Sequence, residues 1–170
     1  MNLLESAKAG IIEFLENDRQ KVLLLNGTEQ FKKHLLALYM IGIFEKRGTL
    51  LFRTNTLRNA EDFLQMKSRA ESGHAYTYNK SLSVYIDTNS SFLWKETPSS
   101  VDYCILYPLE SIEKEEAKKT IVSDAICRTA KKVFIVSSKP QAIEDWLTEF
   151  VDAVVHFDAS RSPIKKNAAF

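Results

Sequence analysis

The fold is decided by the stretch Lys21-Val-Leu-Leu-Leu-Asn-Gly27-Thr-Glu-Gln-Phe-Lys-Lys33-His-Leu-Leu36, which predicts a strand, a glycine turn and a helix. The apolar run 22–25 is too short for a helix and does not alternate, which indicates a central parallel strand covered on both faces. Thr28 is a candidate cap for the helix that follows. That helix is almost wholly apolar over 35–44, so we expect it in the core with little of its surface in water.

Length and composition indicate one soluble globular domain. The chain has 170 residues, of which 45% are hydrophobic and 26% charged, and its formal net charge of +1 gives no overall field for nucleic acid or acidic membranes. No apolar run is long enough to span a bilayer, and the start lacks the apolar core of a signal peptide, so we expect a cytoplasmic protein. Cys104 and Cys127 have no second ligand at metal-binding spacing, so we expect buried reduced thiols without disulfide or zinc.

Strands and helices alternate along most of the chain, which predicts right-handed crossovers and a three-layer α/β fold with a mainly parallel sheet flanked by helices. The expected strands are 22–25, 49–54, 82–86, 92–94, 101–107, 132–138 and 153–157, with 82–86 and 92–94 at an edge. The expected helices are 3–16, the segment from Thr28 to 44, one beginning at Asn55 or Thr56, 112–132 and 140–150. We expect a single α/β domain over 1–158, with an amphipathic N-terminal helix over 1–17, a loop and β-hairpin insertion over 67–100, and a flexible tail over 159–170.

The turn after the first expected strand has part of a phosphate-binding motif. Such a loop needs glycines for close backbone approach, a lysine for the outer phosphates and a hydroxyl for magnesium. The segment 27–34 resembles the first motif of the P-loop NTPases, GxxxxGK[ST], with Gly27 on its first glycine and Lys33 on its lysine. Lys32 replaces the second glycine, His34 replaces the hydroxyl residue, and Glu29 lies inside the loop. The resemblance implies a fold like that of a RecA or helicase lobe, with eroded catalytic residues.

Two weaker similarities follow in the chain order of that family. The strand 101–107 should end in an acidic residue that holds magnesium, but its first following carboxylate is Glu110, while Asp102 lies at its beginning. Ser137 and Ser138 end the next expected strand and resemble the small polar residues by which helicase-like cores sense the nucleotide. Ordinary turn residues would look the same.

Other groups of polar residues are explained as well by surface structure. His74, Tyr76 and Tyr78 could stack bases, but a solvated loop accounts for them. Asp87 with Lys95 and Glu96 is the nearest approach to a nuclease cluster, and it lacks the acidic-x-lysine step. The charges of 112–132 alternate in sign at helical pair spacing, which favours a solvent face.

Taken together, the patterns favour a non-catalytic or weakly nucleotide-binding P-loop-like module that acts by binding within a nucleic-acid- or NTPase-associated assembly. ATP or another nucleotide is the only cofactor they suggest, with no metal ligands, and we expect a protein partner, nucleic acid as a second candidate, and no membrane. The candidate anion-binding residues are Gly27, Lys33, His34, Ser137 and Ser138.

Two other functions remain open from the sequence. One is an active enzyme that binds a phosphorylated ligand at the same rim, in a deep pocket lined by Lys33, His34 and Ser137. The other is a protein-interaction domain without nucleotide, which would make contact through the helix 3–15 or through the region of Tyr76 and Trp94.

Overall fold

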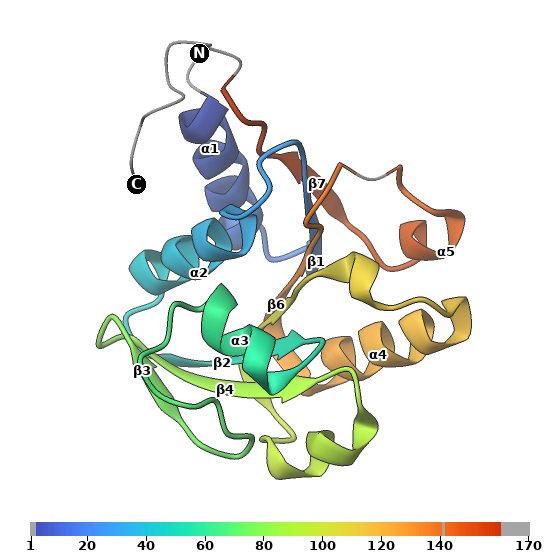
Figure 1. Ribbon diagram of the computed structural model, residues 1–170. Helices are drawn as coiled ribbons and strands as arrows, with labels where there is room; N and C mark the ends of the chain where they lie inside the picture. Colours follow the sequence, from blue (N-terminus) through green and yellow to red (C-terminus); the bar gives the residue numbers. More distant parts are fainter. Residues whose placement is uncertain (1–2, 141, 161–170) are drawn as a thin grey trace.

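The protein is described by a computed structural model over residues 3–140 and 142–160, and its described strands form one sheet (Figure 1). The strand order is β3-β4-β2-β5-β6-β1-β7, and the β3–β4 pair alone is antiparallel within this described sheet. The strands are β1 (Val22–Asn26), β2 (Gly48–Thr54), β3 (Tyr76–Tyr78), β4 (Leu82–Thr88), β5 (Val101–Leu106), β6 (Thr129–Val136) and β7 (Ala153–His156).

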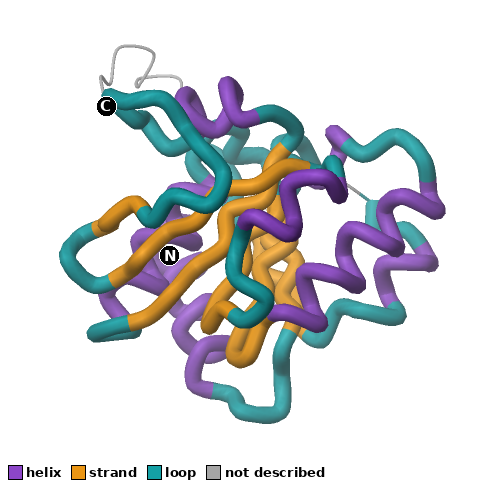
Figure 2. Tube along the Cα trace, turned by 90° about the horizontal axis from the view of Figure 1, so that it is seen from below, coloured by secondary structure: helices purple, strands orange, loops and turns teal. Residues whose placement is uncertain are grey.

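Helices cover both faces of this sheet, which gives the three layers that the sequence predicts (Figure 2). The helices are α1 (Leu3–Glu16), α2 (Lys33–Phe44), α3 (Leu57–Phe63), α4 (Glu115–Arg128) and α5 (Asp145–Thr148), with short 3₁₀ helices η1 (Ser91–Glu96) and η2 (Leu109–Ser111). Helices α1, α2 and α3 pack on one face, and α4 and α5 pack on the other. The expected three-layer, mainly parallel α/β fold is confirmed.

Strand β1 lies inside the sheet, where its apolar run predicts it. It pairs in parallel with β6 on one side and with β7 on the other, and all five of its residues are buried. Leu23 and Leu25 join the core under α1 and α2, whereas Val22 and Leu24 join the core under α4. The turn after β1 therefore opens at the carboxyl rim of an interior strand, the place where open α/β sheets bind ligands.

Helix α2 differs from the prediction at its start and on its surface. It begins at Lys33 and its N-cap residue is Lys32, so Thr28 is not the cap. The Thr28 hydroxyl instead accepts a hydrogen bond from the Ala159 N–H at 2.8 Å, because the loop after β1 lies against the chain that follows β7. Tyr39 and Ile43 are about half exposed, so more of this apolar helix faces water than the sequence indicates.

The segment between α3 and β5 also departs from the prediction. The segment 82–86 forms β4 as expected, but β4 is not at the edge, because it pairs in parallel with β2 on one side and antiparallel with β3 on the other. The edge strand is β3, which the sequence places in a loop. The expected strand 92–94 is wrong, because it forms η1, in which Trp94 turns toward the sheet. The expected helices 112–132 and 140–150 are shorter, as α4 and α5, and position 141 lies outside the described residues.

Three smaller expectations concern the cysteines, the tail and membranes. Cys104 is buried as expected, but Cys127 is exposed, because it lies on the solvent side of α4. Of the expected tail over 159–170, residues 161–170 lie outside the described part of the chain. No described helix is long and apolar enough to cross a membrane.

Candidate functional site

The loop between β1 and α2 lies close against the end of β7, and a glycine permits this approach. Gly27 has a φ of +121°, and a Cβ atom at this position would lie 2.4 Å from the carbonyl oxygen of Phe157. The close approach follows from the sheet, because β1 and β7 pair in register up to Asn26 and His156. Only glycine combines this left-handed backbone with this contact.

Two backbone donors at the start of the loop are already used by the protein. The Glu29 N–H donates to the Phe157 carbonyl at 3.1 Å, and the Thr28 N–H donates to the Asp158 carboxylate at 2.9 Å. A phosphate-binding loop turns such N–H groups toward the anion. In this loop, the two groups point instead to the chain after β7, and one of them already contacts a carboxylate.

Lys33 fills the inside of the loop with its own ammonium group. The residue is fully buried, and its Nζ donates to the carbonyl of Gly27 at 2.6 Å, to the carbonyl of Glu29 and to the carbonyl of Ser138 at 3.5 Å. Burial lowers the pKa of Lys33, and the nearby carboxylates of Glu110, Glu29 and Asp158 oppose that shift. The lysine lies at the start of α2 beside the loop, and its partners are backbone carbonyls from this loop and from the segment after β6.

The two serines after β6 have separate roles. Ser138 donates its N–H to the Glu110 carboxylate at 2.8 Å, and its hydroxyl contacts the same carboxylate. Ser137 is buried, and its hydroxyl hydrogen-bonds to Oδ1 of Asn26 at 2.9 Å. Gly27, Lys33 and Ser138 therefore meet at the rim, while Ser137 ties β6 to the end of β1.

His34 lies beside this cluster but faces a different set of residues. Its Nε2 is 2.8 Å from the carbonyl oxygen of Phe63, and its ring stacks on Tyr107 with centroids 4.0 Å apart. Burial lowers the pKa of His34 to about 4, so the ring is neutral at physiological pH. It therefore adds no positive charge to the loop.

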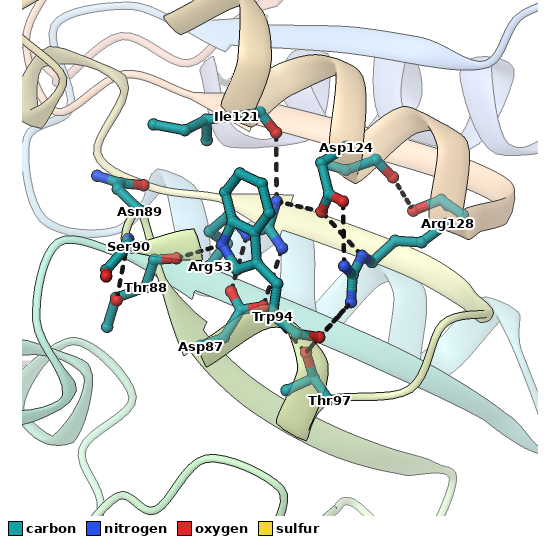
Figure 3. A network of polar contacts seen from close by, with 12 residues as sticks. Arg53, Asp87, Thr88, Asn89, Ser90, Trp94, Thr97, Ile121, Asp124 and Arg128 are labelled. Atoms are coloured by element: carbon teal, nitrogen blue, oxygen red, sulfur yellow. Dashed lines mark hydrogen bonds and ion pairs between the residues drawn. The ribbon is translucent and has the colours of Figure 1, made fainter. Parts of the chain in front are cut away.

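A larger polar network, which the sequence does not predict, ties β2 and β4 to α4 (Figure 3). Arg53 is fully buried and forms a two-pronged ion pair with Asp87, with distances of 2.8 Å and 2.9 Å. Its Nη1 also lies 2.8 Å from the Asp124 carboxylate, and the Trp94 ring covers the guanidinium at 4.2 Å. Asp87 is thus half of a structural ion pair and is not grouped with Lys95 and Glu96 as a nuclease cluster would require.

Arg128 completes the network from the last turn of α4. It pairs with Asp124 through two hydrogen bonds of 2.9 Å and 3.1 Å, and it donates to the carbonyls of Trp94 and Pro98. Two arginines and two aspartates therefore balance in charge. The sequence holds one signal for this network, namely a single charged residue in each of two otherwise apolar strands. These are Leu-Leu-Phe-Arg53 and Val-Tyr-Ile-Asp87.

Metal binding has little support in the described part of the chain. No group of three or more histidine, cysteine or acidic side chains among residues 3–140 and 142–160 is arranged to hold a metal ion. Glu110 is the first carboxylate after β5, where a metal-binding acidic residue was expected. It already accepts a hydrogen bond from the Ser138 N–H.

The comparisons with known proteins give similarity in structure without similarity in sequence. No family model matches the sequence, and no curated protein matches it significantly. Two solved structures of the large terminase from a thermophilic bacteriophage, one of them with ADP, each have a TM-score of 0.58 and 8% identity. They match 89% and 91% of this chain, which spans only 44% and 45% of the terminase chains.

A third solved structure is similar over almost its whole length. It is the C-terminal domain of a possible DNA helicase from Lactobacillus plantarum WCFS1, with a TM-score of 0.53 and 15% identity, covering 91% of this chain and 96% of that one. At such low sequence identity, the similarity in structure establishes the fold alone. The chain thus has a three-layer, mainly parallel α/β fold like that of the large terminase and of the helicase C-terminal domain.

Proposed function

We propose that this chain is a non-catalytic P-loop-like module that acts by binding within a nucleic-acid- or NTPase-associated assembly. The observation that carries the proposal is the loop after β1, whose interior is filled by the Lys33 ammonium. The N–H groups of Thr28 and Glu29 are bonded to the Asp158 carboxylate and the Phe157 carbonyl. A nucleotide phosphate would have to displace the lysine and compete with the Asp158 carboxylate.

The residues around the loop also argue against hydrolysis. His34 stands where a magnesium-binding hydroxyl is required, and it is neutral and turned toward Phe63. Glu110 is the nearest carboxylate after β5, and Ser138 already donates two hydrogen bonds to it. Phosphoryl transfer depends on positioned cations and a metal-binding carboxylate. The residues found at these positions, His34 and Glu110, therefore support a role in binding without catalysis.

The surface of α2 supports a role within an assembly. Tyr39 and Ile43 are 46% and 53% exposed and lie four residues apart on α2, so they are neighbours on its surface. Phe31, which is 74% exposed, lines the same surface groove as Tyr39. Exposed apolar side chains that lie close together are a feature of protein-contact surfaces. The helicase domain that this chain resembles in structure is by its description part of a longer protein, and we infer that this chain also works beside another domain or subunit.

Titration with ATP and magnesium, followed by the melting temperature, tests the proposal. We expect ATP–Mg to raise the melting temperature no more than adenosine does, because the phosphates have no site, and we expect no phosphate release. The control is Lys33→Ala. An ATP-specific increase that disappears in this variant would overturn the proposal in favour of nucleotide binding at the loop.

The helix 3–15, which the sequence offers as a contact region, is α1 in the structure, and a charge on its apolar stripe does not test that role. Ile11 is fully buried, so a charge at this position would unfold the protein and would not probe a surface. Tyr39→Glu and Ile43→Glu change exposed positions on α2. We expect these variants to fold normally and to lose association with the partner, as measured by sedimentation or pull-down once that partner is identified.

A further inference from the structure

A shallow groove runs between helices α1 and α2, which pack beside each other on one face of the sheet (Figure 1). Its volume is about 610 Å³. Of the described residues that line it, only two lysines are charged, and most of the others are apolar. The residues that matter here are Leu4 and Lys8 of α1, Leu35 and Tyr39 of α2, and Phe31 and Lys32 in the turn before α2.

The groove exposes aromatic side chains next to a positive charge. Phe31 is 74% exposed and Tyr39 is 46% exposed. Lys8 reaches from α1 toward α2, and its Nζ lies 5.9 Å from the centre of the Tyr39 ring. Lys8 also pairs with Glu5 at 3.5 Å, but the Glu5 side chain is 62% exposed, and a surface ion pair of this kind contributes little. Lys8 therefore remains able to attract a further carboxylate.

The outer face of α1, next to this groove, has the opposite charge. Its C-terminal half presents Ile12, which is 40% exposed, and the exposed side chains of Glu13 and Glu16. With Ala9, these residues border a hollow in the surface, and none of the described residues that line the hollow is basic. Helix α1 thus supplies one wall of a positively charged apolar groove and, one turn further, an acidic surface around an apolar side chain.

We propose that two copies of this chain form a dimer through this face, with their α1 helices antiparallel. The N-terminal half of each α1, with Lys8 and the groove, then lies beside the C-terminal half of the other. Ile12 of each copy packs against the groove, and Glu13 and Glu16 approach Lys8 and Lys32. Because the same contact forms twice about a two-fold axis, the assembly closes at two copies.

The walls of the groove favour a helix as the occupant. Helices α1 and α2 use their backbone N–H and C=O groups internally, so the groove recognises an occupant through side chains, as in helix-in-groove binding. The segment 161–170 of the same chain is the other candidate occupant. It contains Arg161, Lys165 and Lys166 and no acidic side chain, so the groove lysines repel it. The acidic face of α1 from a second copy has the complementary charge.

This dimer names a second copy as one partner within the assembly, and to that extent it rests on the proposed function. Lys33 lines neither the groove nor the hollow on α1, and the contact needs no nucleotide. Association measured without nucleotide therefore reports on the dimer alone. A monomer would remove the dimer and leave the ATP titration undecided, and an ATP-specific stabilisation would leave the dimer untouched.

Sedimentation velocity over a range of protein concentrations tests the dimer. We expect the wild type to change from monomer to dimer as its concentration rises. Lys8→Glu and the double variant Glu13→Lys/Glu16→Lys each bring like charges together, so we expect each to dimerise at least about tenfold more weakly. The matched control is Glu113→Lys/Glu116→Lys, which reverses two exposed carboxylates with the same spacing at the start of α4, on the other face of the sheet.

An equimolar mixture of the two weakened variants is the decisive measurement. In a mixed dimer, every reversed charge again faces the opposite charge, so we expect the mixture to form dimers at concentrations where each variant alone is monomeric. A merely damaged fold would not be rescued in this way. Circular dichroism of each variant verifies that its helices are intact.

Three results would contradict the dimer. One is a wild type that stays monomeric up to millimolar concentration, as expected if the segment 161–170 or a different protein occupies the groove. Another is a control variant that dimerises as weakly as Lys8→Glu, and the third is a mixture that stays as monomeric as its components.

Discussion

Lys33, at the start of α2, and Arg53, near the end of β2, are both fully buried cations, and the protein compensates them differently. Arg53 meets two carboxylates, those of Asp87 and Asp124, and its pKa is raised because their attraction outweighs burial. Lys33 is bonded only to backbone carbonyls in the described contacts, and burial lowers its pKa.

This difference indicates that the two cations have different roles. Arg53 connects strands β2 and β4 to helix α4, and the two arginines of its network are matched by two aspartates. Lys33 has no ion pair with a carboxylate in the part of the chain that the structure describes, and its ammonium group lies inside the loop after β1. We infer that removing a partner of Arg53 damages the fold, whereas removing Lys33 mainly changes the loop.

The largest expected effect comes from Asp87→Ala. The substitution leaves Arg53 buried without its two-pronged partner, and breaking a buried pair in this way costs about 3–5 kcal/mol. We expect the free energy of unfolding to fall by that amount in urea denaturation. The double variant Arg53→Met/Asp87→Leu should recover much of the loss, because it removes both charges. A loss of less than about 1 kcal/mol in the single variant would contradict the structural role of the pair.

The second-largest expected effect is a loss of stability at low pH that comes from His34. This residue is buried beside Lys33 and is neutral at physiological pH. Its pKa is about 4 in the folded protein and about 6.5 in the unfolded chain, so the unfolded chain binds the proton first as the pH falls. The stability from neutral His34 is complete above pH 6.5 and is lost toward pH 4. At pH 5 the loss is about 2 kcal/mol.

Melting curves of the wild type and of His34→Phe at pH 7 and pH 5 measure this effect. Carboxylates titrate in both proteins, so the difference between the two proteins isolates the histidine. We expect the wild type to lose more stability than the variant over this range. Equal losses would show that His34 takes up a proton in the folded state.

The sequence predicts much of the scaffold around these two cations, because the scaffold depends on local patterns. The apolar runs of β1, β5 and β6 are buried on both faces and are recognisable without any partner. The segment 92–94 has the same apolar character, yet it forms η1, in which Trp94 packs on the guanidinium of Arg53. Such a contact between distant residues cannot be read from a local pattern.

In the candidate site, too, local sequence patterns predict where residues lie in the chain but not which distant residues they contact. The spacing of Gly27 and Lys33 locates the loop, but the partners of Lys33 include Ser138, which lies 105 positions away. The direction of His34 depends on α3 and on the end of β5, since it contacts Phe63 and Tyr107. Residue positions were therefore predictable, whereas the closing of the loop by its own lysine was not.

The third effect tests the contact that holds the loop of Lys33 against β7. In Gly27→Ala, the new methyl group would meet the Phe157 carbonyl at 2.4 Å with the backbone at a φ of +121°. A strained backbone of this kind costs roughly 1–3 kcal/mol, and we expect a loss in that range by thermal or urea denaturation. Gly48→Ala is the control, because a Cβ there approaches only side-chain atoms, at 3.1 Å or more. A loss no larger than that of the control would show that the loop can move away from β7.

The smallest expected effect, and the sharpest test of the contrast, is Lys33→Met. Methionine keeps most of the side-chain volume and removes the charge, so the variant loses hydrogen bonds to carbonyls but no longer buries an ammonium group. These terms oppose each other, and we expect a net loss of about 1 kcal/mol, the usual size of a hydrogen-bond contribution. Arg53→Met should cost several times more in the same urea denaturation, because it leaves Asp87 and Asp124 without their shared cation. If the two variants lost the same free energy, Lys33 would be as much a structural tie as Arg53, and the distinction between the two buried cations would fail.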